Sequence, residues 1–444
     1  MSLPTGAKTP DLTGGFTADT ALVGDYLRTT EEKLAELPSR RERSPEQEAR
    51  VEAVRNSARA ARLSFVRVHG KRLHDELTDG GRAALRLHEL AFGAADLLPG
   101  LVPTRDVIAA ERLRIQPEKE GYEVDQGILF WGLLRAQSAG LRLMSSMLRP
   151  TPRALAELAE FRRTGLADLG TVTIERRDGI GHVTVRNLRF LNAEDDSLAD
   201  DFETAVDLVL LDDSVHVGVV RGAPMTHPRY TGRRVFNSGI NLTRLYNGQI
   251  SFVDFLLRRE LGYINKILRG IRIEAGDDLS PDGSVEKPWV AAVDSFAIGG
   301  GMQLLLVFDH VIAESGSYFS LPAVQEGIVP GAANFRLSRA VGHRRARQII
   351  LGGRKVRAAD PEALLICDEV VDPEQMDKAV HTAAECLDNP SVASNRRMLN
   401  LADEPDDRFR VYMAEFSLEQ SRRLYSRDVM DNLERTWISR SQRR

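Results

Sequence analysis

Two glycine-bearing stretches carry residue types that can stabilise a developing negative charge. They are residues 236–241, FNSGIN, and residues 298–304, IGGGMQL. Glycine lets a ligand approach the backbone without meeting a Cβ atom, and a helix that begins at the triplet would present free N–H groups. One N–H from each stretch, with Gly300 or Gly301 as the second donor, would form a hole for an enolate or an oxyanion. A tight strand-to-helix turn without a ligand is the alternative explanation of the triplet.

Other patterns that could do chemistry are few. The long loop 224–242 holds Arg234 and two further arginines, which are expected either to bind phosphate groups or to be solvated. No His, Cys or carboxylate group has a metal-ligand spacing, and His69 and His74 are five residues apart, so no metal is expected. The chain also lacks the G-x-G-x-x-G pattern, a Walker A sequence and the G-x-S-x-G pattern.

The composition is that of an ordinary globular protein with two or three folding units. The 444 residues are 42% hydrophobic and 28% charged, with a net charge of −4, which argues against nucleic acid as a partner. No apolar run is long enough for a membrane span, and the N-terminus lacks the pattern of a signal peptide. Cys367 and Cys386 form no disulfide framework, so the cytoplasm is the expected location.

Periodicity divides the chain into three segments. Residues 1–170 are predicted to form a helical N-terminal domain, because apolar residues recur at spacings of three and four. Its longest helix is predicted from Pro45 to Leu77 with Ser44 as N-cap, and its many Arg and Glu residues predict a solvated helix face. Further helices are expected near 81–92, 104–115, 123–148 and 151–164.

Strands alternate with helices in residues 171–355. Strand-like runs lie at 172–174, 180–185, 215–220, 289–293 and 310–313, and helices are expected at 197–211, 252–269 and 300–307. Ser197 or Asp196 is the predicted cap of the first of these helices. Several strands are continuously apolar, which indicates a parallel sheet covered by helices. Residues 356–444 are predicted to be a helical C-terminal region with an extended piece at 368–371.

Together these features resemble the crotonase, or enoyl-CoA hydratase/isomerase, superfamily over about residues 171–386. The resemblance is carried by both glycine stretches and by Asp309, Pro322 and the runs 327–331 and 336–342. It implies an α/β fold with a crotonase-like ββα spiral core, an acyl-CoA substrate, and a homo-oligomer that is a trimer or a dimer of trimers. It also implies that Ile240 and Gly300 donate the two N–H groups, and that Arg234 contacts the coenzyme A portion.

Two departures from the superfamily pattern argue against simple hydration. Hydratases carry one glutamate two residues after the glycine triplet and another after the proline of the following loop, where this chain has Gln303 and Ala323. Addition of water needs an acid and a base, but glutamine cannot take up a proton and alanine has no polar atom. Glu326 lies on the same loop, three residues further along.

The helical extension, Gln303 and Ile240 together resemble one branch of the superfamily, the cofactor-independent dioxygenases, over nearly the whole chain. This implies that 3,5-dihydroxyphenylacetyl-CoA and O2 give 3,5-dihydroxyphenylglyoxylate and coenzyme A, with no cofactor, in the supply of dihydroxyphenylglycine for glycopeptide antibiotics. An arylacetyl thioester has an acidic benzylic carbon, so a two-donor hole would hold an enolate able to reduce O2. An acyl-CoA isomerase or thioesterase, with Glu326 or Glu194 as base, and a non-enzymatic helical scaffold are the alternatives.

Residues for the remaining roles of such an enzyme can be named. Arg259 would hold a ring hydroxyl, although Arg258 is an equal candidate and either could be solvated. Glu194 would accept a hydrogen bond from the other hydroxyl, or else lie at the surface before a helix. Gln303 is expected to hydrogen-bond the substrate, and the Ile240 side chain to line an apolar O2 pocket or to pack in the core. No residue is identifiable as the general base.

Overall fold

The computed structural model describes residues 9–273 and 283–441, without the side chains of residues 436–441. The chain divides into two compact units, each built from separate stretches of sequence. The first unit comprises Met1–Ser146, Thr243–Asp254 and Asp406–Arg444, and the second comprises Met147–Leu242 and Phe255–Pro405. These boundaries differ from the expected segments 1–170, 171–355 and 356–444, because the C-terminal helices are shared between the two units.

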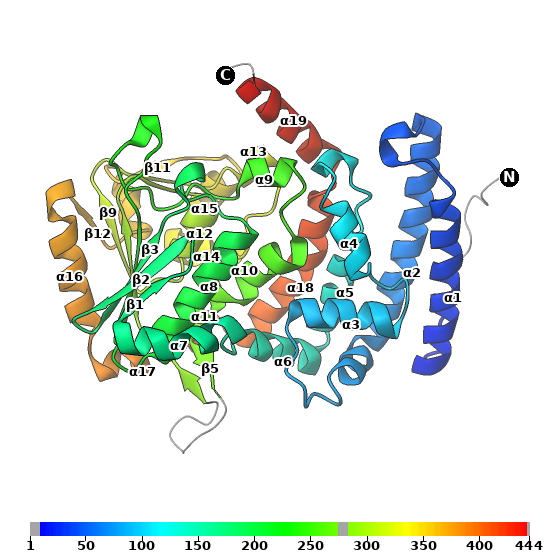
Figure 1. The fold of residues 1–444 in the computed structure, drawn as a ribbon, viewed down its shortest axis with the longest axis horizontal. Helices are drawn as coiled ribbons and strands as arrows, with labels where there is room; N and C mark the ends of the chain where they lie inside the picture. The colour runs from blue at the N-terminus through cyan, green and yellow to red at the C-terminus, as the bar shows by residue number, and fades with distance from the viewer. Residues whose placement is uncertain (1–8, 274–282, 442–444) are drawn as a thin grey trace. The chain divides into compact units, whose positions relative to one another are not determined.

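The first unit contains only helices among its described elements (Figure 1). They are α1 (Phe16–Ala35), α2 (Pro45–Leu77), α3 (Leu87–Leu97), α4 (Arg105–Glu111), α5 (Glu123–Arg135), α6 (Gln137–Met147), α9 (Leu242–Tyr246), α18 (Asp406–Arg423) and α19 (Arg427–Ser441). The predicted bounds of α2 are confirmed, and so is its cap. The Ser44 hydroxyl accepts from the Gln47 N–H at 3.2 Å, and the Gln47 side chain accepts from the Ser44 N–H at 2.8 Å. Throughout the described ranges, every helix is too short or too polar to cross a bilayer.

Helices α2 and α5 touch through glycines. A Cβ atom at Gly70 would lie 2.6 Å from the Gly132 carbonyl oxygen, and one at Gly132 would lie 2.4 Å from the Val66 Cβ. Every residue of α5 from Glu123 to Leu134 is buried, because both α2 and α18 pack against this helix. A helix that is buried on every side has no solvent-exposed face. Its sequence therefore does not separate into an apolar stripe and a polar face.

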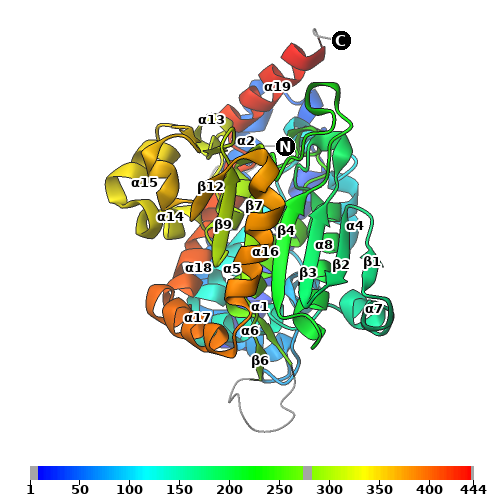
Figure 2. The same cartoon turned by 90° about the vertical axis from the view of Figure 1, so that its left-hand side faces the viewer.

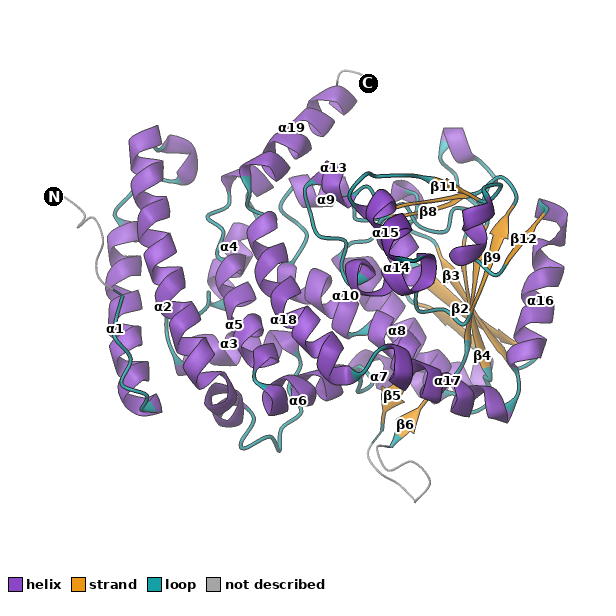
Figure 3. Ribbon diagram, turned by 180° about the vertical axis from the view of Figure 1, so that it is seen from behind, coloured by secondary structure: helices purple, strands orange, loops and turns teal. Residues whose placement is uncertain are grey.

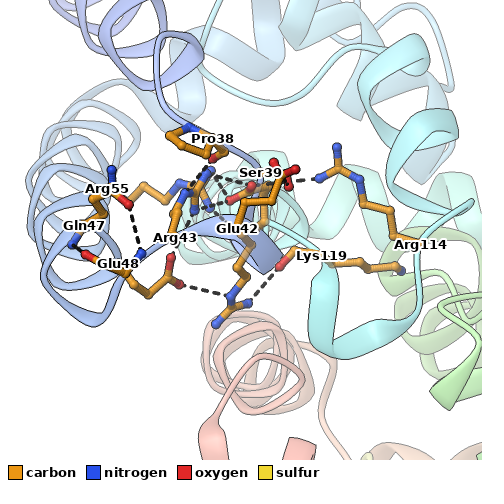
Figure 4. Close-up of polar contacts among 12 residues, drawn as sticks. Pro38, Ser39, Glu42, Arg43, Gln47, Glu48, Arg55, Arg114 and Lys119 are labelled. Carbon is orange, nitrogen blue, oxygen red and sulfur yellow. Dashed lines mark hydrogen bonds and ion pairs between the residues drawn. The ribbon is translucent and has the colours of Figure 1, made fainter.

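The charged loop before α2 is held by an ion-pair network (Figure 4). Arg43 binds both carboxylate oxygens of Glu120, at 2.9 and 2.8 Å, and Arg55 binds the same carboxylate at 2.8 Å. Arg40 donates to the Lys119 carbonyl oxygen at 2.8 Å. The loop is therefore fixed to the segment that precedes α5.

The prediction of a solvated helix face is wrong at Arg62 of α2. This side chain is 3% exposed and pairs with Glu31 at 3.1 Å and with Asp125 of α5 at 3.4 Å. Carboxylates on neighbouring helices neutralise the buried guanidinium, an arrangement that a single helix pattern does not reveal.

The second unit contains all the described strands, so the prediction of an α/β fold is confirmed (Figure 3). The strands are β1 (Leu166–Asp168), β2 (Val172–Arg177), β3 (Ile180–Val185), β4 (Val217–Gly222), β5 (Ile271–Arg272), β6 (Ser284–Val285), β7 (Trp289–Val293), β8 (Phe296–Ile298), β9 (His310–Glu314), β10 (Tyr318–Ser320), β11 (Val356–Arg357) and β12 (Glu369–Val371). The α-helices are α7 (Pro152–Thr164), α8 (Asp196–Leu211), α10 (Arg258–Leu261), α11 (Tyr263–Arg269), α12 (Gly300–Leu305), α13 (Ala323–Glu326), α14 (Ala333–Val341), α15 (His343–Ile350), α16 (Met376–Leu387) and α17 (Pro390–Asp403).

Within the described residues, a seven-stranded sheet has the order β1-β2-β3-β4-β7-β9-β12. The pairs from β1 to β3 are antiparallel and those from β3 to β12 are parallel. Helix α16 covers one face, where Val380 packs near Val219 and Val290 (Figure 2). Helix α8 covers the other face, since a Cβ atom at Gly181 would lie 2.9 Å from Val209. A smaller sheet, β11-β10-β8, leads into the second glycine stretch.

Three predicted elements of this unit need correction. Helix α8 begins at Asp196 and its cap is Asp195, whose side chain accepts from the Leu198 N–H at 3.1 Å, so both predicted caps are wrong. Residues 166–168 form β1 rather than helix, because they pair with β2. The predicted helix 252–269 is divided into a π-helix (Phe252–Leu257), α10 and α11, since Gly262 has a non-helical ψ of −110°.

We expect Gly132→Ala to lower the free energy of unfolding by roughly 1–3 kcal/mol, because the added methyl group would force α2 and α5 apart. Urea unfolding followed by circular dichroism measures this loss. Gly93→Ala on α3 is the matched control, since its Cβ would meet only a Leu77 methyl group at 3.3 Å. Equal stability of the two variants would contradict the close crossing.

Candidate active site

Arg259 of α10 is the centre of a buried polar cluster in the second unit. Its Nε donates to Glu194 Oε2 at 2.9 Å, and its Nη1 donates to Glu260 Oε1 and to Gln303 Oε1, both at 2.6 Å. Its Nη2 donates to the Gly300 carbonyl oxygen at 2.6 Å. Arg259 is 4% exposed, and its three side-chain partners are also buried. A guanidinium has five N–H groups, so one N–H on Nη2 has no acceptor among the described residues.

The predicted first donor, Ile240, lies between two backbone hydrogen bonds that tie the first glycine stretch to Glu194. The Glu194 N–H donates to the Gly239 carbonyl oxygen, and the Asn241 N–H donates to the Glu194 carbonyl oxygen, both at 2.8 Å. Strand-like pairing of this kind turns the Ile240 N–H away from Glu194. No described acceptor takes up this N–H. Gly239 has a φ of +84°, which explains the glycine.

The two glycine stretches are hydrogen-bonded to each other. The Ile298 N–H donates to the Asn237 carbonyl oxygen at 3.0 Å. A Cβ atom at Gly301 would lie 2.6 Å from the Asn237 Cβ, so the stretches are in direct contact. Helix α12 begins at Gly300, whose N–H has no acceptor in the described part of the chain. The two predicted donors, Ile240 and Gly300, thus lie on adjoining loops with free N–H groups.

Glycine is required at two places where backbone meets this cluster. A Cβ atom at Gly300 would lie 1.7 Å from Glu194 Oε2 and 2.9 Å from Arg259 Nη2. Gly331 has a φ of +46°, and its Cβ would lie 2.0 Å from Glu260 Oε1. The loop at Gly331 is fastened by the next residue, since the Ala332 N–H donates to Glu260 Oε2 at 3.1 Å.

The Arg259 guanidinium lies between two carboxylates and near a phenol. Burial alone would lower the pKa of Arg259, but the carboxylates of Glu194 and Glu260 outweigh it and raise that pKa. The Tyr263 hydroxyl donates to Glu194 Oε1 at 3.0 Å, and burial raises the pKa of Tyr263, so the phenol stays protonated. The cluster therefore combines a permanent cation, two acidic groups and a neutral hydroxyl in a space closed to water.

The structure distinguishes the two adjacent arginines. Arg258 donates to Glu203 at 2.6 Å and to Asp200 at 2.8 Å, both on α8, whereas Arg259 contacts the glycine stretch and Gln303. Glu194, which could have been a surface carboxylate, is 3% exposed. Arg259, Glu194, Gln303 and Gly300 are thus brought together.

Arg234 lies outside this cluster. It is half-buried and donates to the Gly222 carbonyl oxygen at 2.9 Å. It lines a cavity of about 360 Å³ together with Arg221, His182 and His381. Burial, and then the charge of Arg221, lower the pKa of Arg234. This position leaves its contact with coenzyme A a prediction.

Two buried members of the cluster, Glu260 and Tyr263, were missed by sequence reasoning. Tyr263 follows Arg259 at the i,i+4 spacing that brings helical residues to one face, so this signal was available. Glu260 directly follows Arg259, and sequence neighbours on a helix do not face each other, so no pattern pointed to it. Among the described residues, no group of three or more His, Cys, Asp or Glu side chains is arranged to hold a metal ion.

Comparison with known proteins adds independent findings. A family model described as enoyl-CoA hydratase/isomerase matches residues 276–417. The chain is 55% identical over 405 residues to the (3,5-dihydroxyphenyl)acetyl-CoA 1,2-dioxygenase of Amycolatopsis orientalis, covering 90% of this chain and 92% of that protein. It is 28% identical to a probable enoyl-CoA hydratase of Rhizobium meliloti, covering 57% and 92% respectively. A solved enoyl-CoA hydratase from Mycobacterium avium subsp. paratuberculosis matches at a TM-score of 0.50 and 22% identity, covering 61% and 100% respectively.

Gly300→Ala is expected to displace the Glu194–Arg259 pair, because its methyl group would occupy the position of Glu194 Oε2. We expect turnover to fall by at least about 100-fold, since catalytic groups misplaced by about 1 Å lose that much. Steady-state kinetics measures the loss, and circular dichroism checks the fold. A wild-type rate would show that the pair can move without consequence.

The stability of the protein should depend on Glu326 at alkaline pH. Burial raises the pKa of this carboxyl group from about 4.5 to about 7, and the side chain is partly exposed. Because the folded state holds the proton more tightly than the unfolded state does, ionisation of Glu326 lowers the stability of the fold. This loss of stability is absent below about pH 4.5 and complete above pH 7. Glu326→Gln should therefore stabilise the protein at pH 8, by at most about 3 kcal/mol, and not at pH 4.5. Thermal unfolding measures this, with the exposed Glu52→Gln as control; the same gain at both pH values would contradict the shift.

Proposed function

The chain belongs to the enoyl-CoA hydratase/isomerase, or crotonase, superfamily, and we propose that it is a cofactor-independent dioxygenase acting on (3,5-dihydroxyphenyl)acetyl-CoA. The products are 3,5-dihydroxyphenylglyoxylate and coenzyme A. The observation that carries the proposal is the 55% identity to the Amycolatopsis dioxygenase over 90% of the chain. The similarity to the Rhizobium hydratase covers only 57% of the chain.

The first step is loss of a benzylic proton from the thioester. The enolate places negative charge on the thioester oxygen, and the free N–H groups of Ile240 and Gly300 are suited to donate hydrogen bonds to that oxygen. Their loops are joined through Asn237 and Ile298, so the two donors are held in place before substrate arrives. The base for this step has no assigned residue, and Glu326 makes no bond to the cluster among the described residues.

The enolate then transfers one electron to O2, and the resulting radicals combine to a peroxide at the α-carbon. The peroxide attacks the thioester carbonyl carbon, and the thiolate of coenzyme A leaves. Breaking the O–O bond with loss of the remaining α-proton gives the α-keto acid. Both atoms of O2 enter the product, one in the keto group and one in the carboxylate. Exclusion of water protects the enolate from reprotonation, and the Ile240 side chain is proposed to line the apolar space for O2.

The ring hydroxyls are proposed to bind at the Arg259 cluster. The unused N–H on Arg259 Nη2 is one donor. Gln303 supplies another, because Arg259 already occupies its Oε1 and leaves the Nε2 group free to bind a substrate oxygen. Glu194 can accept from a hydroxyl, since each of its oxygens carries a second lone pair. Donors and an acceptor side by side suit a ring with two hydroxyl groups.

The remaining parts of the proposal concern binding and assembly. Arg234 is proposed to contact the coenzyme A portion, with its cavity beside Arg221 as supporting geometry. Trimeric assembly, or a dimer of trimers, is proposed from the superfamily. No nucleic acid, membrane, metal or organic cofactor is included in the proposal.

The reaction is tested by O2 consumption with EDTA-treated protein and (3,5-dihydroxyphenyl)acetyl-CoA, while release of free coenzyme A is followed in parallel. Equal uptake and release, without added metal or flavin, is the expected result. Release of coenzyme A without O2 uptake would identify a thioesterase and overturn the proposal.

Arg259→Lys should lower kcat/KM for oxygen uptake by roughly 10- to 100-fold, because lysine lacks the planar fork that binds four acceptors at once. Arg258→Lys is the matched control, since Arg258 binds Glu203 and Asp200 instead. We expect the control to retain activity within about threefold. If both variants lost activity equally, the loss would come from helix α10 and not from the ring site.

A further inference from the structure

Tyr263 makes a hydrogen bond that the proposed reaction has not used. It is the first residue of α11 and is 1% exposed. Its hydroxyl donates to Glu194 Oε1, while Arg259 Nε donates to Glu194 Oε2. Its ring packs edge-on against Phe202 of α8, with ring centres 4.9 Å apart, and the Arg259 guanidinium lies 5.9 Å from the ring centre. The ring is therefore held from two sides.

The two hydrogen bonds fix the plane of the Glu194 carboxylate. Tyr263 and Arg259 each donate to a different oxygen, so the carboxylate cannot rotate without losing a bond. Its free lone pairs then point in fixed directions.

The position of Tyr263 is itself set by buried ion pairs. Lys266, one turn along α11 and fully buried, binds Asp207 at 2.7 Å and Glu203 at 2.9 Å. Helix α11 is thus fastened to α8 through Lys266, and the Tyr263 hydroxyl has little freedom to move.

We propose that Tyr263 is a positioning residue that orients the Glu194 carboxylate to accept a hydrogen bond from one ring hydroxyl of the substrate. The inference rests on the proposed function and deepens it. Tyr263 acts on the substrate through Glu194, to which its hydroxyl donates. Its contribution should therefore appear only with ligands that carry ring hydroxyls, and it should set the preference for a hydroxylated ring over a bare phenyl ring.

Binding without O2 tests this role, because turnover cannot occur. The dissociation constants of (3,5-dihydroxyphenyl)acetyl-CoA and phenylacetyl-CoA are measured by anaerobic calorimetric titration with wild type and Tyr263→Phe. We expect the variant to bind the dihydroxy ligand about tenfold more weakly and the phenyl ligand within twofold of wild type. Tyr425→Phe is the matched control, since it removes a partly buried tyrosine hydrogen bond to Glu123 in the other unit. It should change neither constant.

A second variant keeps the test decisive. Glu194→Gln should reproduce the selective loss, and adding Tyr263→Phe to it should cost nothing further, because the bond then has no carboxylate to orient. Equal weakening of both ligands by Tyr263→Phe, or no weakening, would overturn the role of Tyr263. A wild-type protein that binds both ligands equally would instead overturn the proposed ring recognition itself.

Discussion

The buried guanidinium of Arg259 is the constraint on which this site depends. Arginine stays charged in proteins, so a side chain that is 4% exposed must find acceptors for its N–H groups or lose much of the stability of the fold. Glu194, Glu260, Gln303 and a backbone carbonyl supply them. These hydrogen bonds fix the orientation of each acceptor, and they also fix the chain segment to which each acceptor belongs.

This constraint explains residue choices that otherwise look unrelated. Glycine at position 300 leaves room for the Glu194 carboxylate, and glycine at 331 leaves room for that of Glu260. A glutamate at position 303, as hydratases have, would put a third carboxylate around a single cation. Gln303 accepts from the same N–H without adding charge.

Sequence reasoning named Arg259, Glu194, Gln303 and Gly300 of the cluster, but it missed Glu260 and Tyr263. It also could not decide whether Arg258 or Arg259 faces the glycine stretches. The glycine stretches were found because backbone approach requires glycine, and Ile240 and Gly300 indeed lie on adjoining loops. The choice between Arg258 and Arg259 stayed open because a π-helix precedes them and Gly262 interrupts the helix after them. Both features shift the angular position of every side chain along the segment.

One of the other differences is local: Asp195 rather than Asp196 caps α8, a one-residue difference that neighbouring acidic residues conceal in the sequence. Long-range contacts account for the rest. The burial of Arg62 depends on its ion pair with Asp125, which lies on another helix. The position of the Glu260 carboxylate depends on a hydrogen bond from the N–H of Ala332, far along the chain. Contacts of this kind are set by tertiary packing, whereas a periodic pattern reports only the local chain.

The proposed reaction depends on an enolate, held at these loops, that reacts directly with O2. The most direct measurement is turnover of (3,5-dihydroxyphenyl)acetyl-CoA under ¹⁸O2 in ordinary water, with the α-keto acid analysed by mass spectrometry. Both atoms of one O2 molecule are expected in the product, one in the keto group and one in the carboxylate. A carboxylate oxygen derived from water would contradict it, because coenzyme A would then have left by hydrolysis and not by attack of the peroxide.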